Sequence, residues 1–286
     1  MAGEEVLADY RSTLTGRKLK EQRAGLDAAD AALAKARTRD SLQAVGKLTT
    51  VADGRRRIIS DPPLVVPIDQ LLGFDIDVLL ERLRKLLEAY SATLQSDRRR
   101  LLGHFTLADA AHKVVEVGSV GTRAWILLLE ADGTDDVLLL QAKQAQASAL
   151  AEYAGASQYA NQGERVVSGQ HLRQATSDIF LGWMRARPVG REDEDYYVRQ
   201  LRDWKLSAVI EEMSPQSMNV YARLCGWTLA RGHARAGDRV AIAGYLGKSP
   251  TFDEAVADFA ETYATQTERD HALLAAAVTA GHVEAR

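Results

Sequence analysis

One segment, residues 113–143, constrains the fold of this chain more than any other. It contains two strand-like apolar runs, 125–129 and 137–140, which a polar Asp-Gly turn separates. A glycine turn precedes the first run, and the second run leads to Lys143. Short apolar runs bounded by glycine turns are typical of β-hairpins. The segment therefore predicts a sheet in which a glycine turn and a lysine belong to consecutive strands.

The glycine turn has two interpretations, and the first is a loop that binds phosphate. It consists of Gly118, Ser119, Val120 and Gly121. Glycine lets backbone amides approach phosphate oxygens closely, and a lysine on a nearby strand supplies a point charge for the phosphates. Gly118, Ser119, Gly121 and Lys143 are therefore candidate nucleotide-binding residues. The other interpretation is an ordinary β-hairpin with a lysine downstream, because short glycine motifs are common.

Composition and charge narrow the range of partners. The chain has 286 residues, of which 46% are hydrophobic and 26% charged, and its formal net charge is −3. This balance gives no electrostatic case for binding nucleic acid or an anionic membrane. No apolar run approaches the roughly 20 residues of a membrane helix, and the N-terminus lacks the apolar region of a secretory signal. We therefore expect a cytoplasmic protein with neither nucleic acid nor membrane as a partner.

The single cysteine, Cys225, excludes a disulfide framework and a cysteine-based metal site within one chain. It lies in an apolar helical pattern, which predicts a small buried core residue. A single cysteine also suits a reducing compartment such as the cytoplasm.

The apolar periodicity along the rest of the chain predicts an α+β fold with three parts. The expected parts are an N-terminal helical segment and hairpin over 1–60, an α+β region over 61–205, and a helical region over 206–286. The hairpin is expected to turn at Asp53-Gly54. The middle part would hold a small mixed β-sheet with one inserted helix. Helices are expected within 1–45, 76–90, 161–177, 251–265 and 267–280 and onward from 215, and strands at 64–68, 179–184 and 196–201.

Glu164, on the helix expected after the lysine strand, completes a kinase-like series of parts. In the small lobe of a protein kinase, a glycine loop precedes a lysine strand, then a helix whose glutamate pairs with the lysine, then further strands. The carboxylate holds the flexible ammonium in position for the phosphates. Glu164 is thus the candidate partner of Lys143, and the alternative is a solvated surface glutamate.

No other motif supplies catalytic chemistry. The histidines show no zinc-binding spacing, and no glycine-flanked serine elbow occurs. No metal site is therefore expected within the recognised motifs, and the catalytic residues are unknown. Asp203 and Asp238 are the carboxylates that an active small-molecule phosphotransferase could use, which is one alternative function.

Several blocks of this sequence resemble a bacterial family known as domain of unknown function 2252, which is grouped with the protein-kinase-like fold. The resemblance covers most of the chain after residue 35. The blocks are 35–49, 113–125, 165–183, 196–205, 221–238, 242–260 and 263–274.

The chain departs from the family pattern at several positions. Glu116 stands where members tend to have glycine, and an acidic residue near a phosphate does not favour tight ATP binding. Gln144 and Ser168 stand where members tend to carry glutamate. Family members also have a His-Gly-Asp block and an Asp-rich block in their N-terminal portion, and neither occurs in this chain. The chain thus resembles the C-terminal portion of the family.

The resemblance implies a kinase-like ATP-binding fragment that is inactive alone, because the catalytic and metal-binding loops are lacking. Magnesium would bind only if its ligands came from outside the recognised motifs. The alternative is a structural or protein-interaction module that has lost nucleotide binding. In either case, a missing N-terminal portion or a second copy of the chain would complete the fold.

Overall fold

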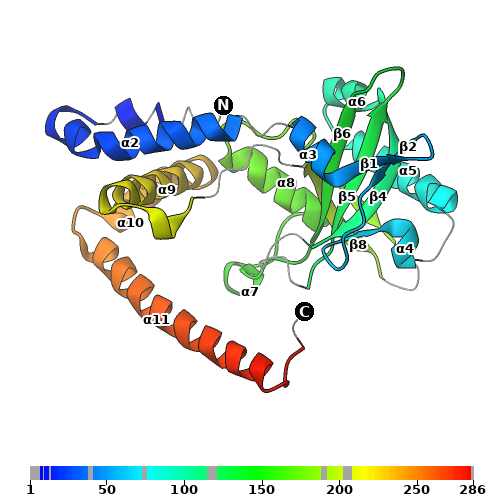
Figure 1. Ribbon diagram of the computed structural model, residues 1–286. Helices are drawn as coiled ribbons and strands as arrows, with labels where there is room; N and C mark the ends of the chain where they lie inside the picture. Colours follow the sequence, from blue (N-terminus) through cyan, green and yellow to red (C-terminus); the bar gives the residue numbers. More distant parts are fainter. Residues whose placement is uncertain are drawn as a thin grey trace. The chain divides into compact units, whose positions relative to one another are not determined.

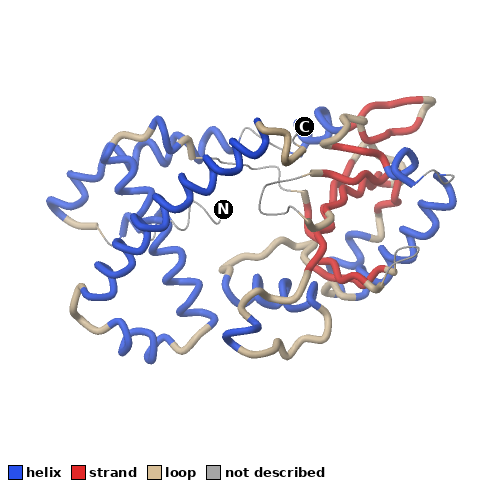
Figure 2. Tube along the Cα trace, turned by 90° about the horizontal axis from the view of Figure 1, so that it is seen from below, coloured by secondary structure: helices blue, strands red, loops and turns tan. Residues whose placement is uncertain are grey.

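The computed structural model describes residues 7–8, 10–12, 14–37, 41–72, 76–114, 121–187, 192–201 and 208–284. The chain divides into two compact units, Met1–Ala236 and Gly237–Arg286. The first unit contains the strands, which Figure 2 shows in red gathered together among helices. The candidate site belongs to this unit.

A six-stranded sheet forms the centre of the first unit. Its strand order is β3-β4-β5-β6-β8-β7, and every pairing in it is antiparallel. The sheet predicted from the sequence was mixed, so that detail was wrong. The strands are β3 (Val65–Pro67), β4 (Phe105–Lys113), β5 (Ala124–Ala131), β6 (Val137–Ala145), β7 (Gly182–Ala186) and β8 (Glu194–Gln200). The predicted α+β class is confirmed.

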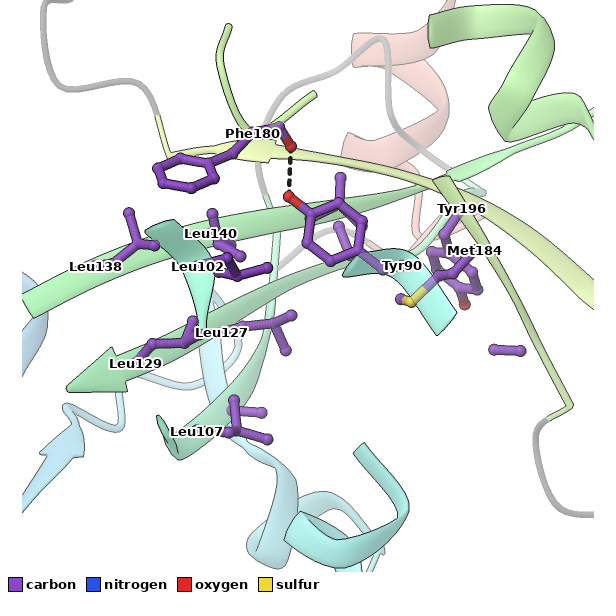
Figure 3. Packing of buried hydrophobic residues seen from close by; sticks show 14 of the residues in the cluster. Tyr90, Leu102, Leu107, Leu127, Leu129, Leu138, Leu140, Phe180, Met184 and Tyr196 are labelled. Carbon is purple, nitrogen blue, oxygen red and sulfur yellow. Dashed lines mark hydrogen bonds between the residues drawn. The ribbon is translucent and has the colours of Figure 1, made fainter. Parts of the chain in front are cut away.

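One face of the sheet packs against α5 (Ile76–Ala92), the amphipathic helix that apolar spacing predicts. Leu79, Leu80 and Tyr90 of α5 are buried against leucines from β4, β5 and β6. Figure 3 shows Tyr90 among these leucines, with its hydroxyl directed at the carbonyl oxygen of Phe180. The short helices α4 (Ile68–Leu72) and α6 (Ser96–Leu102) contribute Ile68 and Leu102 to the same core.

The opposite face is partly covered by N-terminal elements. Val45 of α3 (Ser41–Leu48) and Ile58 of β2 pack against Ile126, Leu128 and Leu139 of the sheet. The hairpin of β1 (Thr49–Ala52) and β2 (Arg55–Ile58) turns at Asp53 and Gly54, as the sequence predicts.

The tight hairpin turn between β1 and β2 needs left-handed backbone at both of its central residues. Asp53 has φ +52° and Gly54 has φ +71°. Two-residue hairpin turns of this kind match the twist of the strands, and Asp-Gly is among their favoured sequences. The Asp-Gly signal therefore located the turn correctly.

A helical pair extends the first unit beyond the sheet. The helix α2 (Gly16–Arg37) lies alongside α9 (Pro215–Ala236), as Figure 1 shows. A methyl group added at Gly25 would lie 2.5 Å from Cγ2 of Val220, so only glycine permits this approach. Leu26 and Val220 are buried in the contact. The N-terminal helices are thus packed rather than loosely attached.

The side of α9 that packs against α2 carries Val220, and the single cysteine lies on a different side of the same helix. Cys225 is exposed, so its predicted place in the core was wrong. The sequence pattern identified the helix correctly but not which side of it is buried. The remaining elements of the first unit are α7 (Ala151–Ala154), α8 (Gln162–Arg173) and a 3₁₀ turn at Ile210–Glu212.

The second unit consists of α10 (Arg239–Leu246) and α11 (Thr251–Thr279). The sequence predicts two helices, over 251–265 and 267–280, where the structure has one continuous helix. The residue between them, Gln266, is polar but does not break a helix, so the division was wrong. No helix among the described residues is long and apolar enough to cross a bilayer.

Candidate functional site

Lys143 lies on β6, in the middle of the sheet. It is opposite Ala124 of β5 on one side and Tyr197 of β8 on the other. Side chains alternate between the two faces of a strand, so Lys143 shares a face with Leu139 and Gln141. This is the face that α3 partly covers through Leu139. The Lys143 side chain is half-buried.

The described end of the glycine turn, Gly121, lies just before β5, the strand that pairs with the lysine strand. Gly118 and Ser119 lie outside the described residues, as does Glu116, whereas Gly121 is described and has φ +82°. The backbone N–H of Gln144 donates to the carbonyl oxygen of Arg123 at 2.8 Å, just before β5 begins at Ala124. The structure therefore brings the C-terminal side of the turn next to the residues that flank Lys143.

Glu164 lies in the first turn of α8, the helix that follows the lysine strand. The side chain of Asn161 caps this helix by accepting a hydrogen bond from the Glu164 backbone N–H at 3.0 Å. A capping side chain of this kind satisfies one of the free backbone donors of a helix N-terminus. The predicted pairing of the Glu164 carboxylate with Lys143 stays a prediction.

Asp195 of β8 connects the start of α8 to the sheet through hydrogen bonds. Its carboxylate accepts from the Gln162 backbone N–H at 2.7 Å and from Asn161 Nδ2 at 2.9 Å. Arg185 of β7 donates to the same carboxylate from Nε at 2.7 Å. A carboxylate at a helix N-terminus also interacts favourably with the helix dipole. The first turn of α8, with Glu164, is thus held against β7 and β8.

A second contact places this helix turn near the end of the lysine strand. The guanidinium of Arg165 donates to the carbonyl oxygen of Gln146 at 2.9 Å, and Gln146 follows directly after β6. The register of β6 puts Lys143 three residues before this carbonyl. Gly121, Lys143 and the start of α8 consequently lie at one end of the sheet.

A polar network surrounds this end of the sheet. Arg123 forms an ion pair with Glu194 of β8, and the Tyr196 hydroxyl donates to Glu194 Oε2 at 2.6 Å. Burial, followed by the hydrogen bond to Glu194, raises the pKa of Tyr196 to about 12. Tyr196 therefore stays a neutral donor. The sequence did not predict this network, because Arg123 and Glu194 are brought together only by two strand pairings, β5 with β6 and β6 with β8.

Only one of the two carboxylates considered for an alternative phosphotransferase site lies within the described residues. Asp203 lies outside the described residues. Asp238 caps α10, where its Oδ1 accepts from the backbone N–H groups of Val240 and Ala241 at 2.9 and 3.0 Å. Among the described residues, no group of three or more His, Cys, Asp or Glu side chains is placed to hold a metal ion.

The fold and this end of the sheet define an α+β protein with a lysine strand between a glycine turn and a capped helix. The chain belongs to the family described as "Uncharacterized protein conserved in bacteria (DUF2252)", whose model matches residues 5–277. No curated protein and no solved structure matches the chain.

Proposed function

We propose that the first unit is a kinase-like unit that binds the nucleotide ATP. Alone it is inactive, because the catalytic and metal-binding loops are lacking. In this proposal Gly118, Ser119 and Gly121 cover the phosphates, Lys143 contacts them, and Glu164 orients the lysine. The main support is the register of β5 and β6, in which Lys143 lies opposite Ala124, the first residue of β5 and the third after the glycine turn. Gly121, the described end of the turn, is therefore only three residues along the chain from the partner of Lys143.

The order of the elements also supports the proposal. The glycine turn joins β4 to β5, the lysine lies on β6, α8 follows, and β7 and β8 complete the sheet. A protein-kinase small lobe has the same series of parts, from glycine loop to lysine strand to helix to further strands. The family resemblance implies that the catalytic base and the magnesium ligands come from outside the motifs present in this chain.

The test is isothermal titration with ATP, with and without magnesium, on the wild-type protein and on Lys143→Ala. We expect Lys143→Ala to weaken binding at least about tenfold, which corresponds to about 1.4 kcal/mol. The matched control is Lys85→Ala on α5, an exposed lysine on the helix that covers the other face. Thermal unfolding of both variants separates lost affinity from lost folding. Absence of ATP binding by a folded wild-type protein would overturn the proposal.

A structural or interaction module is the second candidate function, and one sequence feature favours it. Glu116 adds a negative charge to the loop that would cover the phosphates, and like charges repel. Replacing it separates the two candidates. If nucleotide binding is retained but weakened by this charge, Glu116→Gly strengthens ATP binding. If the site has been lost, neither wild type nor Glu116→Gly binds ATP, and the interaction module is the better description.

A further inference from the structure

A cavity lined by arginines lies in the first unit, at the other end of α8 from Glu164. Its volume is about 650 Å³, which is within the range of small-molecule sites. The walls come from the last turn of α8, the loop over 174–179, the end of β8 and the inner side of α9. We name it the arginine cavity after Arg173, Arg199, Arg231 and Arg235, all of which line it.

The charges around the arginine cavity are strongly unbalanced. Asp178 is the single carboxylate among the described residues that line it, against four guanidinium groups. This carboxylate already accepts hydrogen bonds from the backbone N–H groups of Phe180 and Gln200, each at 2.8 Å. Like charges confined to one cavity repel each other more strongly than they do in water. An anion bound among them would relieve that repulsion.

Two of the arginines are held in position by other contacts. Arg235 donates from Nε to the carbonyl oxygen of Leu172 and from a terminal nitrogen to that of Gln174, both at 3.2 Å. It thereby caps the C-terminus of α8. The guanidinium of Arg231 lies 4.7 Å from the centre of the Trp227 ring, in a cation–π contact. Both guanidinium groups are pre-oriented at the cavity wall, so little rotamer entropy would be lost on binding.

Arg199 adds a further observation at the cavity. Its Nε atom is buried and has no hydrogen-bond partner within the described part of the chain. A buried donor without a partner costs about 1–3 kcal/mol, and such groups are rare in folded proteins. Arg199 also lines the arginine cavity, so an anion that binds its guanidinium there can reorient the side chain and give this donor an acceptor.

The ligand chemistry follows from the donors. Arginine presents several N–H groups in a planar fork that fits phosphate and carboxylate oxygens in pairs. The hydroxyl group of Thr176 also lines the cavity and can donate to a further oxygen, whereas the Thr228 hydroxyl already donates to the carbonyl oxygen of Leu224. We propose that the arginine cavity binds a small molecule bearing phosphate groups. This proposal goes beyond nucleotide binding at Lys143, since the residues that would bind the phosphate groups in the arginine cavity are different ones.

The arginine cavity nevertheless adjoins the face of the sheet that carries the lysine. Lys143 is opposite Tyr197, and Gln141 is opposite Arg199, so Lys143 and Arg199 are diagonal neighbours on the two strands. Such neighbours are about 7–8 Å apart on one face. The test must therefore distinguish a second anion site from the phosphate end of the proposed nucleotide site.

The experiment is a titration of the full chain with pyrophosphate, without magnesium and at low ionic strength, for wild type and three variants. Arg199→Met removes the unsatisfied donor but keeps an unbranched side chain of similar length. We expect it to weaken pyrophosphate binding at least tenfold and to leave the thermal stability of the unliganded protein unchanged or higher. Arg55→Gln, at an exposed arginine on the β1–β2 hairpin, is expected to bind like wild type. Lys143→Ala is expected to keep the binding that Arg199→Met loses.

Three results would overturn the proposal. The first is no pyrophosphate binding by wild type, and the second is equal binding by wild type and Arg199→Met. The third is an equal loss in Lys143→Ala, which would assign the phosphate to the lysine site instead. A parallel titration with citrate, a tricarboxylate, distinguishes the ligand classes. Binding of citrate as tightly as pyrophosphate would replace the phosphate assignment with a carboxylate one.

Discussion

The hydroxyl of Tyr90 on α5 donates a hydrogen bond to the carbonyl oxygen of Phe180, at 2.5 Å, just before β7 begins. Tyr90 is fully buried, and Figure 3 shows this contact above the leucines of the sheet. Burial raises the pKa of Tyr90 above its ordinary range, and the Asp178 charge acts in the same direction. The tyrosine is therefore a neutral donor that joins α5 to a strand 90 residues away.

Tyr90→Phe is expected to lower the free energy of unfolding by about 1–3 kcal/mol, because it leaves the Phe180 carbonyl without its partner in the core. Ring packing is retained, so the change reports the hydrogen bond. Urea denaturation followed by circular dichroism gives the measurement. Tyr153→Phe is the control, since Tyr153 is 81% exposed and its replacement should change stability by less than about 0.5 kcal/mol. Equal stability of the two variants would contradict the prediction.

Two glycines of the same helix, α8, are expected to respond oppositely to alanine. A Cβ at Gly163 would lie 2.2 Å from the carbonyl oxygen of Tyr196, which is backbone and cannot rotate away. Gly163→Ala must therefore push α8 away from β8, at a cost of about 1–3 kcal/mol or more. A Cβ at Gly169 would meet nothing within 4 Å. Gly169→Ala should stabilise the helix by about 0.5–1 kcal/mol, because glycine is a poor helix former.

Thermal unfolding of the two glycine variants, measured side by side, tests this prediction. The expected result is a lower midpoint for Gly163→Ala and a slightly higher one for Gly169→Ala. Because Gly163 precedes Glu164 on the turn that Asp195 holds, a displaced α8 would also move the candidate partner of Lys143. If Gly163→Ala were as stable as Gly169→Ala, the helix could shift without a loss of stability, and the prediction would be wrong.

The local patterns of the sequence predicted those elements whose signal is contained in one segment. The three- and four-residue spacing of apolar residues located α5, and Asp53-Gly54 located the first hairpin, because each pattern reflects a single local geometry. By contrast, β4 was missed. Its alanines at 110 and 111 are both fully buried, so the strand lacks alternation, and alanine is depleted in strands.

The candidate site was predictable only in part. The order of glycine turn, lysine strand and helix can be seen along the chain. The register that places Lys143 opposite Ala124 cannot be seen along the chain, and neither can the hydrogen bonds from the start of α8 to Asp195. The arginine cavity combines residues from 170 to 235, and nothing local indicates that their side chains meet. Contacts between distant segments depend on strand pairing and helix packing, which no short pattern contains.

A buried carboxylate joins the β1–β2 hairpin to the sheet. Asp109 of β4 accepts from the backbone N–H groups of Ile58 at 2.9 Å and Ala110 at 2.8 Å, and Arg57 lies 3.7 Å away. Burial raises the pKa of this carboxyl, while the two N–H groups and Arg57 act in the opposite direction. The carboxylate is thus the shared acceptor for two backbone donors that water does not reach.

Asp109→Ala is expected to lower the free energy of unfolding by about 2–4 kcal/mol, because two backbone donors and a charge lose their partner. The control is Glu81→Ala on the exposed side of α5, where loss of the pair with Arg84 should cost less than about 0.5 kcal/mol. Hydrogen exchange at Ile58 gives a second readout. Its amide should exchange faster in Asp109→Ala, and unchanged protection would contradict the assigned hydrogen bond.

His112 of β4 should make the stability depend on pH. Its ring meets Trp125 edge to face, with ring centres 5.4 Å apart. Burial lowers the pKa of His112, and the positive charge of Arg123 lowers it further. The unfolded chain, with a histidine pKa of about 6.5, therefore binds more protons than the folded protein between that value and the lowered one. By linkage, the free energy of unfolding rises with pH across this window and is lost as pH falls through it.

The measurement is urea denaturation of wild type and His112→Gln at several pH values between about 5 and 8, where histidines titrate. The stability difference between the two proteins should be constant above the window and change as pH falls below about 6.5, with a slope of at most about 1.4 kcal/mol per pH unit for one proton. Other titrating groups are common to both proteins, so the difference isolates His112. A difference that is independent of pH would show that this histidine accepts a proton as readily in the folded protein as in the unfolded chain.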